Sequence, residues 1–311
     1  MLLISVCNSK GSAHPFGGRL ARAMARGGKK LRSAKPKPKC KAKASATRRT
    51  TATLQNSRAT RCCHPDWVRH VAMALQDKFE AIAQKQMQLR INVWLDCGGI
   101  GTEMHAGECI AKGLAQFGID VSFHLYGGSD KCGHATAAVQ HAFAPKHWSN
   151  NILDRDLKTG RFTCVVHDTG TCQLPQGCIE MFSASFPCSP WSPRGRRQGL
   201  KDPKDGDLIW QVLDTISFME PFLFMMENVL EITNSDDDDV ESSDLDKIVE
   251  VMKKQLCKYH VIMISGVCPS NLGFPNVRKR WFCLGSKLNN ELAIAANRFI
   301  NLPPMPKGTA C

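Results

Sequence analysis

The fold of this 311-residue chain is decided by one short stretch, Leu95-Asp96-Cys97-Gly98-Gly99-Ile100-Gly101-Thr102-Glu103. The apolar run over 91–96 predicts a buried β-strand, and the apolar periodicity that follows predicts a helix over 104–117. A glycine-rich turn between a strand and a helix lets the backbone approach a nucleotide-like ligand and points a helix N-terminus at it. Alone, this turn does not distinguish a ligand site from an ordinary tight turn.

Strands and helices alternate along much of the remaining chain. Further strands are predicted over 121–126, 162–167, 179–184, 221–226, 260–265 and 281–285, and further helices over 66–85, 134–143, 206–219 and 244–257. This alternation predicts an α/β fold built on a doubly wound, mostly parallel sheet. The apolar runs are far shorter than the roughly 20 residues that span a bilayer, so no membrane partner is expected.

The positive charge is concentrated in one segment. Residues 1–62 hold 16 of the 41 Lys and Arg residues and no acid, which leaves 25 basic and 28 acidic residues in the remainder. This composition predicts a disordered basic tail. The tail is interpreted as a solvated leader, as a nuclear-localisation or nucleic-acid-contacting arm, or as an organelle transit peptide. We favour the second, which predicts location in the nucleus, with an organelle as the alternative.

Three further segments combine reactive side chains with strand ends. Phe186-Pro187-Cys188-Ser189-Pro190 follows the strand 179–184, and its prolines form a rigid loop that holds the thiol outward. Glu227-Asn228-Val229 ends a very apolar strand with a carboxylate and an amide. Asn276-Val277-Arg278-Lys279-Arg280 enters the strand at 281, and the alternation places both arginines on one face. Each segment alone also fits a structural turn or a structural hydrogen bond.

Taken together and in this order, the four segments resemble the cytosine-C5 DNA methyltransferases over roughly residues 91–286. The resemblance implies a fold of the class I S-adenosylmethionine-dependent methyltransferase type, that cofactor, and a nucleic-acid partner. The partner is expected to be DNA, with tRNA or another RNA as the alternative. The cofactor-binding residues implied are Asp96, Cys97, Gly98, Gly99, Ile100, Gly101, Thr102, Asp130, Asn151, Ile152 and Pro187.

The resemblance also implies catalytic roles. Cys188 is the expected nucleophile, whose thiolate adds to C6 of cytosine so that C5 accepts the methyl group. Glu227 is expected to donate to N3 and the exocyclic amine, while Arg278 and Arg280 hold the base. The base must leave the duplex for this chemistry. A catalytically dead homologue that binds nucleic acid is the alternative.

Several positions depart from the family pattern. Cys97 stands where a phenylalanine is usual, and Thr102 where a second glycine is usual. Asp130 is the best substitute for the acid that holds the cofactor's ribose, and Asn151 replaces the acid beside the adenine. Asn276 replaces a glutamine, and residues 155–178 resemble an inserted hairpin.

The C-terminal part is shorter than the family pattern. Only 25 residues follow Ser286, too few for a target-recognition domain. We therefore expect a tail over 1–62, a catalytic domain over 63–290 and a truncated remnant over 291–311. A permuted chain, in which the helix Trp67–Ala83 replaces the missing last helix, is the alternative.

The cysteines and histidines were also compared with the spacings of metal sites. The pairs Cys132 with His134 and Cys172 with Cys178 match no common zinc spacing. The sequence therefore predicts no metal site.

Overall fold

The computed structural model describes residues 88–168, 170–234, 242–272 and 276–287. The predicted tail over 1–62, the predicted helix over 66–85 and the predicted remnant over 291–311 lie outside these ranges. The boundaries proposed for the three segments therefore stay predictions.

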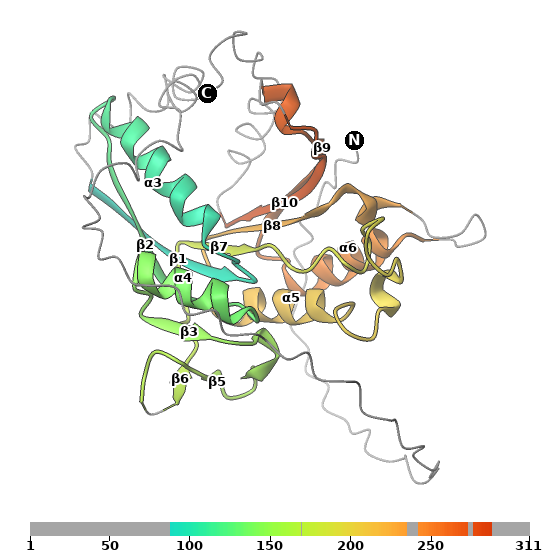
Figure 1. The fold of residues 1–311 in the computed structure, drawn as a ribbon, viewed down its shortest axis with the longest axis horizontal. Helices are drawn as coiled ribbons and strands as arrows, with labels where there is room; N and C mark the ends of the chain where they lie inside the picture. Colours follow the sequence, from blue (N-terminus) through green and yellow to red (C-terminus); the bar gives the residue numbers. More distant parts are fainter. Residues whose placement is uncertain (1–87, 169, 235–241, 273–275, 288–311) are drawn as a thin grey trace, which may run out of the picture. The chain divides into compact units, whose positions relative to one another are not determined.

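A seven-stranded sheet forms the centre of the described chain (Figure 1). Its strands are β1 Gln88–Asp96, β2 Asp120–Ser129, β3 His147–Ser149, β7 Met181–Ala184, β8 Leu223–Val229, β9 His260–Val267 and β10 Arg280–Ser286. They lie in the order β3-β2-β1-β7-β8-β10-β9. All neighbouring pairs are parallel except those that β10 makes with β8 and β9. The predicted α/β fold with a mostly parallel sheet is confirmed.

Helices cover both faces of this sheet. They are α3 Thr102–Ala115, α4 Gly133–Phe143, α5 Leu208–Met219 and α6 Asp244–Gln255. Neighbouring residues of β1 point to opposite faces: Leu95 packs with residues of α3 and α4, whereas Trp94 packs with residues of α5 and α6. Figure 1 shows α3 and α5 on opposite sides of the sheet. Because both faces are covered, the sheet is doubly wound and its central strands are buried.

A second, three-stranded sheet precedes β7. It contains β4 Arg155–Asp156, β5 Arg161–Thr163 and β6 Thr171–Gln173, all paired antiparallel within the expected insertion. The prediction of a strand over 162–167 was wrong, because β5 ends at Thr163 and lies outside the main sheet. The chain turns at Cys164, whose N–H donates to the carbonyl of Gly170 at 3.0 Å. β3, with only three residues, was not predicted.

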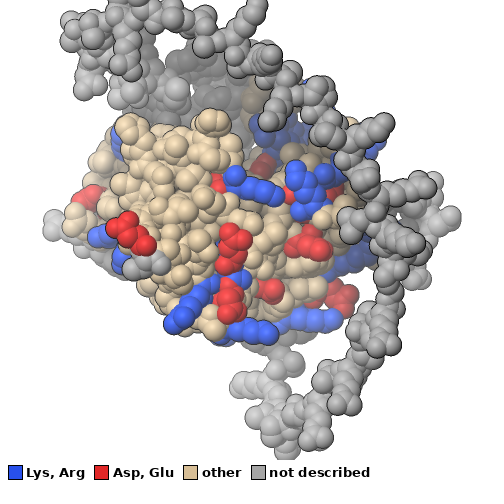
Figure 2. Space-filling model, turned by 60° about the horizontal axis from the view of Figure 1, so that its bottom comes forward, with Lys and Arg blue, Asp and Glu red and all other residues tan. Residues whose placement is uncertain are grey.

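Short 3-10 helices complete the description: η1 Ile152–Asp154, η2 Gly199–Lys201, η3 Leu230–Thr233 and η4 Pro269–Leu272. Within the described ranges, no helix is both long and apolar enough to cross a membrane. On the face shown in Figure 2, acidic and basic side chains are interspersed. Several opposite charges among the described residues are paired, as in Lys254 with Glu250 at 2.7 Å.

Candidate active site

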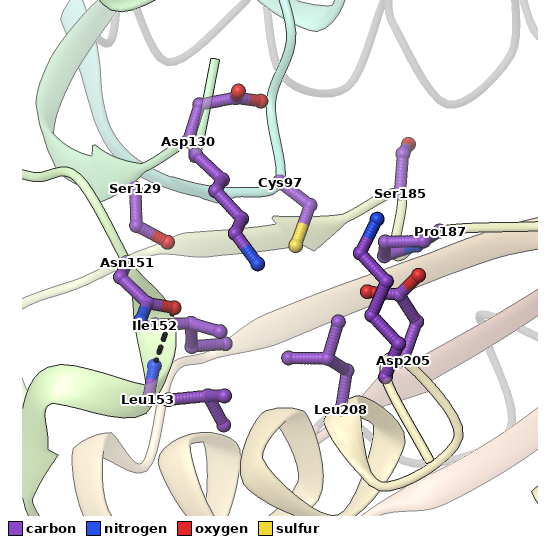
Figure 3. A pocket seen from close by; sticks show the side chains of 12 residues that line it. Cys97, Ser129, Asp130, Asn151, Ile152, Leu153, Ser185, Pro187, Asp205 and Leu208 are labelled. Atoms are coloured by element: carbon purple, nitrogen blue, oxygen red, sulfur yellow. Dashed lines mark hydrogen bonds between the residues drawn. The ribbon is translucent and has the colours of Figure 1, made fainter. Parts of the chain in front are cut away.

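A cleft opens at the carboxyl ends of the parallel strands, where the strand order reverses between β1 and β7 (Figure 3). Its volume, including the open space at its mouth, is about 610 Å³. The carboxyl edge at such a reversal is where open α/β sheets bind ligands. The lining residues are Cys97, Ser129, Asp130, Lys131, Asn151, Ile152, Leu153, Ser185, Pro187, Lys204, Asp205 and Leu208.

Five residues predicted from the sequence to bind a cofactor line this one cleft. They are Cys97, Asp130, Asn151, Ile152 and Pro187. They come from four different segments of the chain, which follow β1, β2, β3 and β7. Parallel pairing brings these segments together, because the carboxyl ends of neighbouring parallel strands meet at one edge of the sheet.

Asp96, by contrast, lies beneath the cleft and does not line it. Its side chain is fully buried, and its carboxylate is paired with the buried guanidinium of Arg155, whose Nη1 donates at 2.6 Å. The Ser129 hydroxyl and the Trp94 indole N–H also donate to this carboxylate, at 2.9 and 3.1 Å. Asp96 therefore ties β1, β2 and β4 together, and any effect on a cofactor is indirect.

The glycine-rich loop turns sharply above Asp96. Gly101 begins α3 at a φ of 78°, and a Cβ there would lie 2.7 Å from the ring of Phe143. A side chain at this position is therefore both strained and blocked. The other predicted loop residues, Gly98, Gly99, Ile100 and Thr102, shape this turn but do not line the cleft. Ile100 is 61% exposed.

Cys97 turns its sulfur into the cleft (Figure 3). Burial, together with the nearby carboxylates of Asp96 and Asp130, raises the pKa of this thiol to about 12. The thiol therefore stays protonated at neutral pH, and it serves as a small, weakly polar wall of the cleft rather than as a nucleophile.

The carboxylate of Asp130 is already engaged by the backbone. It accepts hydrogen bonds from the N–H groups of Gly99 and Cys132, each at 2.7 Å. Figure 3 shows it turned away from the centre of the cleft, so it joins the glycine-rich loop to the start of α4. No acid fits at Gly128, because a Cβ there would lie 2.0 Å from the carbonyl oxygen of Leu95. Close contact between β1 and β2 therefore excludes a side chain at this position.

Asn151 and Ile152 form the opposite wall. The Asn151 side-chain oxygen accepts from the Leu153 N–H at 3.2 Å, which begins η1, and its amide donates to Asp154 at 3.2 Å. Ile152 is buried and presents an apolar surface to the cleft. This wall suits a flat, largely apolar ring more than a charged group.

Cys188 lies at the tip of the loop after β7. Two buried aromatic residues anchor the loop on either side of it: the rings of Phe186 and Trp191 meet at 5.8 Å. The Cys188 carbonyl accepts from Trp191 N–H at 3.0 Å and from Ser192 N–H at 2.8 Å. Because only its backbone is held in this way, the thiol remains exposed.

The far side of the same loop is fixed by charge. The Arg196 guanidinium donates to the buried Asp202 at 2.5 and 2.7 Å and to Asp205 at 3.1 Å. Asp205 also accepts from the Ser189 hydroxyl at 3.2 Å. The residue after the predicted nucleophile is thus linked to a carboxylate that lines the cleft.

The other predicted catalytic residues lie on β8 and at the start of β10. Arg280 Nε pairs with Glu227 at 2.6 Å across the antiparallel strands. The Asn228 amide donates at 3.1 Å to the carbonyl of Phe186, two residues before Cys188. The Glu227–Asn228 strand end therefore contacts both the arginine segment and the cysteine loop.

Burial raises the pKa of Glu227, while Arg280 and Arg278 act in the opposite direction, and Glu103 raises it slightly further. Arg278 is exposed, as is Asn276. Glu103, in the first turn of α3, accepts a hydrogen bond from the Ser185 hydroxyl at 3.0 Å, and burial raises its pKa as well. A partly buried acid that holds its proton more tightly than usual is suited to proton donation.

Sequence reasoning missed several cleft residues. Ser129, Lys131, Leu153, Ser185, Lys204, Asp205 and Leu208 line the cleft but were not predicted to do so. Ser129 ends β2 and Ser185 follows β7, and the sequence predicted a strand at both places. The residues at the carboxyl ends of the predicted strands could therefore have been named as candidates for the cleft. Lys204 and Asp205 arrive through the long loop after Cys188, and no local pattern marks them.

The chain is thus an α/β protein with a cleft at the carboxyl edge of its sheet, and the loop that lines this cleft with Pro187 also carries the exposed Cys188. A family model for the C-5 cytosine-specific DNA methylases matches residues 113–307, which is more than half of the chain. The chain therefore belongs to this family. The match includes Cys188, Glu227 and Arg280, whereas the glycine-rich loop precedes its first residue.

Individual relatives match shorter regions. The chain is 28% identical over 103 residues to the type II methyltransferase M.MspI of Moraxella sp., covering 33% of this chain and 23% of that protein. It is 31% identical over 107 residues to M.HpaII of Haemophilus parainfluenzae, covering 34% and 28%. The chain thus spans about a quarter of the length of these relatives. A solved methyltransferase of Entamoeba histolytica, EhMeth, aligns with a TM-score of 0.45 at 17% identity, over 65% of this chain and 54% of that one.

Proposed function

We propose that the chain holds the catalytic core of an S-adenosylmethionine-dependent DNA cytosine-5 methyltransferase, and that Cys188 is its nucleophile. The observation that carries this proposal is that the three segments predicted to be catalytic contact one another. Asn228 is bonded to the loop of Cys188, and Glu227 is paired with Arg280. The pairing lies at the edge of the sheet where the cleft opens.

The cleft residues fit the proposed cofactor. Ile152, Leu153 and Leu208 offer apolar surface for the adenine, with Asn151 beside it, while Ser129 offers a hydroxyl group for the ribose. Lys131 and Lys204 bring positive charge that complements the carboxylate of the amino-acid part. When bound, S-adenosylmethionine supplies an electrophilic methyl group.

The chain's own residues act on the base. The Cys188 thiolate adds to C6 of a flipped cytosine, so the bond between C5 and C6 becomes single and the displaced electrons form an enamine between C4 and C5 that is nucleophilic at C5. Glu227 donates a proton or hydrogen bond to N3, and Arg280 orients that carboxyl group while it stabilises the developing charge. After C5 is methylated, a base removes the C5 proton, the C5–C6 double bond re-forms, and the bond from C6 to sulfur breaks to release the Cys188 thiolate. Arg278 is exposed beside this pair and is proposed to contact the base or the adjacent phosphate.

The substrate is proposed to be DNA, on the description of the matched family. The experiment incubates the full chain and tritiated S-adenosylmethionine with duplex DNA in one reaction and with tRNA in another. Label in 5-methylcytosine of DNA supports the proposal, and label in tRNA alone would redirect it to an RNA substrate. Failure to bind S-adenosylmethionine in a calorimetric titration would favour a catalytically dead homologue. Location in the nucleus, proposed from the basic segment 1–62, is checked separately by imaging the tagged full chain.

A further inference from the structure

A second group of reactive side chains lies away from the proposed active site. It comprises His147 on β3, Cys164 and His167 in the turn after β5, and Cys172 on β6. One ligand atom from each residue can be chosen so that all four lie within 4.8 Å of one another. The proposed methyl transfer uses none of these residues.

The turn between β5 and β6 brings three of the four together. Phe162 pairs with Cys172 across the two strands, so Cys164 leaves β5 next to Cys172. The Cys164 N–H donates to the Gly170 carbonyl at 3.0 Å, and the Gly170 N–H donates to the His167 carbonyl at 3.0 Å. This closed turn places the His167 ring between the two sulfurs, with Nδ1 at 3.4 Å from Cys164 Sγ and 3.1 Å from Cys172 Sγ.

The fourth member comes from the main sheet. The His147 ring lies 5.1 Å from the His167 ring. Its Nδ1 atom is buried and has no hydrogen-bond partner among the residues that the structure describes. A buried polar atom left without a partner is unfavourable unless something else satisfies it. A metal ion bound at Nδ1 would give this atom a partner.

The two sulfur–nitrogen separations, 3.4 and 3.1 Å, are close to those of a tetrahedral metal site, and the four ligand atoms together lie within 4.8 Å. With bonds of about 2.0–2.3 Å to nitrogen and sulfur, neighbouring ligand atoms lie about 3.3–3.8 Å apart. Two thiolates and two imidazoles are ligands that Zn²⁺ prefers, and a pair separated by two residues, as in Cys164-Val165-Val166-His167, is a common spacing. Sequence spacing alone does not reveal the site. His147 is distant in sequence from the other three residues, and Cys172 lies near Cys164 and His167 and not near Cys178.

We propose that His147, Cys164, His167 and Cys172 bind one structural zinc ion. The two thiols release their protons to solvent as the ion binds, and the two thiolates neutralise its charge. The sequence-based prediction that the chain has no metal site is therefore replaced by this proposal.

The ion would join the edge of the main sheet to the small sheet. His147 belongs to β3, and four residues later Asn151 begins the wall of the cleft. The same segment continues into β4, where Arg155 is paired with Asp96. Zinc bound to His147 would thus stabilise the cleft wall formed by Asn151 and Ile152, which follows β3 in the chain.

The test measures metal content in the full chain, expressed with zinc and purified without chelators. Elemental analysis is expected to find about one zinc atom per chain. The double variant Cys164→Ser, Cys172→Ser is expected to lose it. The matched control Cys178→Ser, Cys257→Ser changes two exposed cysteines outside the group and is expected to keep it.

A second readout does not depend on the variants' folding. Co²⁺ exchanged into the wild-type chain is expected to give the visible absorption of a tetrahedral thiolate complex, and chelation is expected to lower the unfolding temperature until zinc is restored. Wild-type chain without zinc and without this cobalt spectrum would overturn the proposal. So would a Cys164–Cys172 disulfide found by mass spectrometry, or a control variant that loses zinc equally. These readouts do not depend on methyl transfer, so the two proposals fail separately.

Discussion

Two neighbouring strands of the sheet, β1 and β7, each lead into a loop that carries a cysteine, and the two cysteines have opposite surroundings. Cys97, after β1, is enclosed beside Asp96 and Asp130, and burial raises its pKa to about 12. Cys188, after β7, is exposed at the tip of a loop held through its backbone. The comparison teaches that position at the reactive edge does not make a thiol reactive. The loop around the thiol decides whether the thiol is exposed to a substrate.

The two loops are also stabilised differently. The loop of Cys97 rests on a buried ion pair between Asp96 and Arg155. The loop of Cys188 is fixed by buried aromatic rings and by the partly exposed Arg196 with Asp202 and Asp205. Changes in the first loop should therefore affect folding, while changes at the tip of the second should affect chemistry.

The largest expected effect is that of Cys188→Ser. A hydroxyl is a far weaker nucleophile than a thiolate at neutral pH, so the rate of methyl transfer should fall at least about 1,000-fold. Initial rates with tritiated cofactor measure this, and the unfolding midpoint should stay within the error of wild type. Cys257→Ser, another exposed cysteine, is the control and should keep full activity. Substantial turnover by Cys188→Ser would remove this residue from the mechanism.

The next effect concerns the first loop. Arg155→Ala leaves the Asp96 carboxylate buried without its cation, and breaking a buried pair in this way costs about 3–5 kcal/mol of unfolding free energy. Urea denaturation followed by circular dichroism measures this change. Arg161→Ala, at an exposed position on the adjacent strand β5, is the matched control and should cost less than about 1 kcal/mol. Equal effects of the two substitutions would refute the structural role of the Asp96–Arg155 pair.

A smaller effect is expected for Glu227→Gln. The amide keeps the shape and can still contact Arg280, but it cannot donate an acidic proton, so kcat should fall about 100-fold. Burial raises the pKa of Glu227, and wild-type activity should therefore decline as pH rises through that raised pKa. The pH–rate profile of the variant should lack this decline. The control Glu250→Gln, on the exposed face of α6, should reproduce the wild-type pH–rate profile. An unchanged profile in Glu227→Gln would exclude Glu227 as the proton donor.

The smallest effect is a pH dependence of stability at Glu103. Burial raises its folded-state pKa above the ordinary value of 4.5. The folded chain therefore holds a proton that the unfolded chain releases. The resulting stabilisation is complete below pH 4.5 and is lost as pH rises through the raised pKa. Glu103→Gln should lose less stability between pH 4.5 and 7 than wild type does, as measured by urea midpoints. Glu108→Gln, exposed on the same helix, should match wild type; a Glu103 variant that also matches it would contradict this account.

The sequence predicted the strands and helices of the main sheet well, because their apolar periodicity reflects burial on one or both faces. It also predicted that the segments of Cys188, Glu227 and Arg280 meet at one edge of the sheet, and Glu227 does pair with Arg280 while Asn228 is bonded to the cysteine loop. Their catalytic roles stay predictions. It did not predict β3 or the end of β5, because a three-residue strand has no periodicity. It assigned Asp96 to cofactor binding, although Arg155, 59 residues away, engages its carboxylate in the core. Contacts of this kind depend on packing between distant segments, which local patterns do not encode.

The central claim is that Cys188, and not Cys97, forms the bond to cytosine. The most direct measurement incubates the full chain with S-adenosylmethionine and DNA containing 5-fluorocytosine, in which fluorine replaces the C5 proton whose loss releases the enzyme. Peptide mass spectrometry should then find the base attached to the peptide that contains Cys188, with Cys97 unmodified. An adduct on Cys97, or no adduct although the cofactor is bound, would contradict the account.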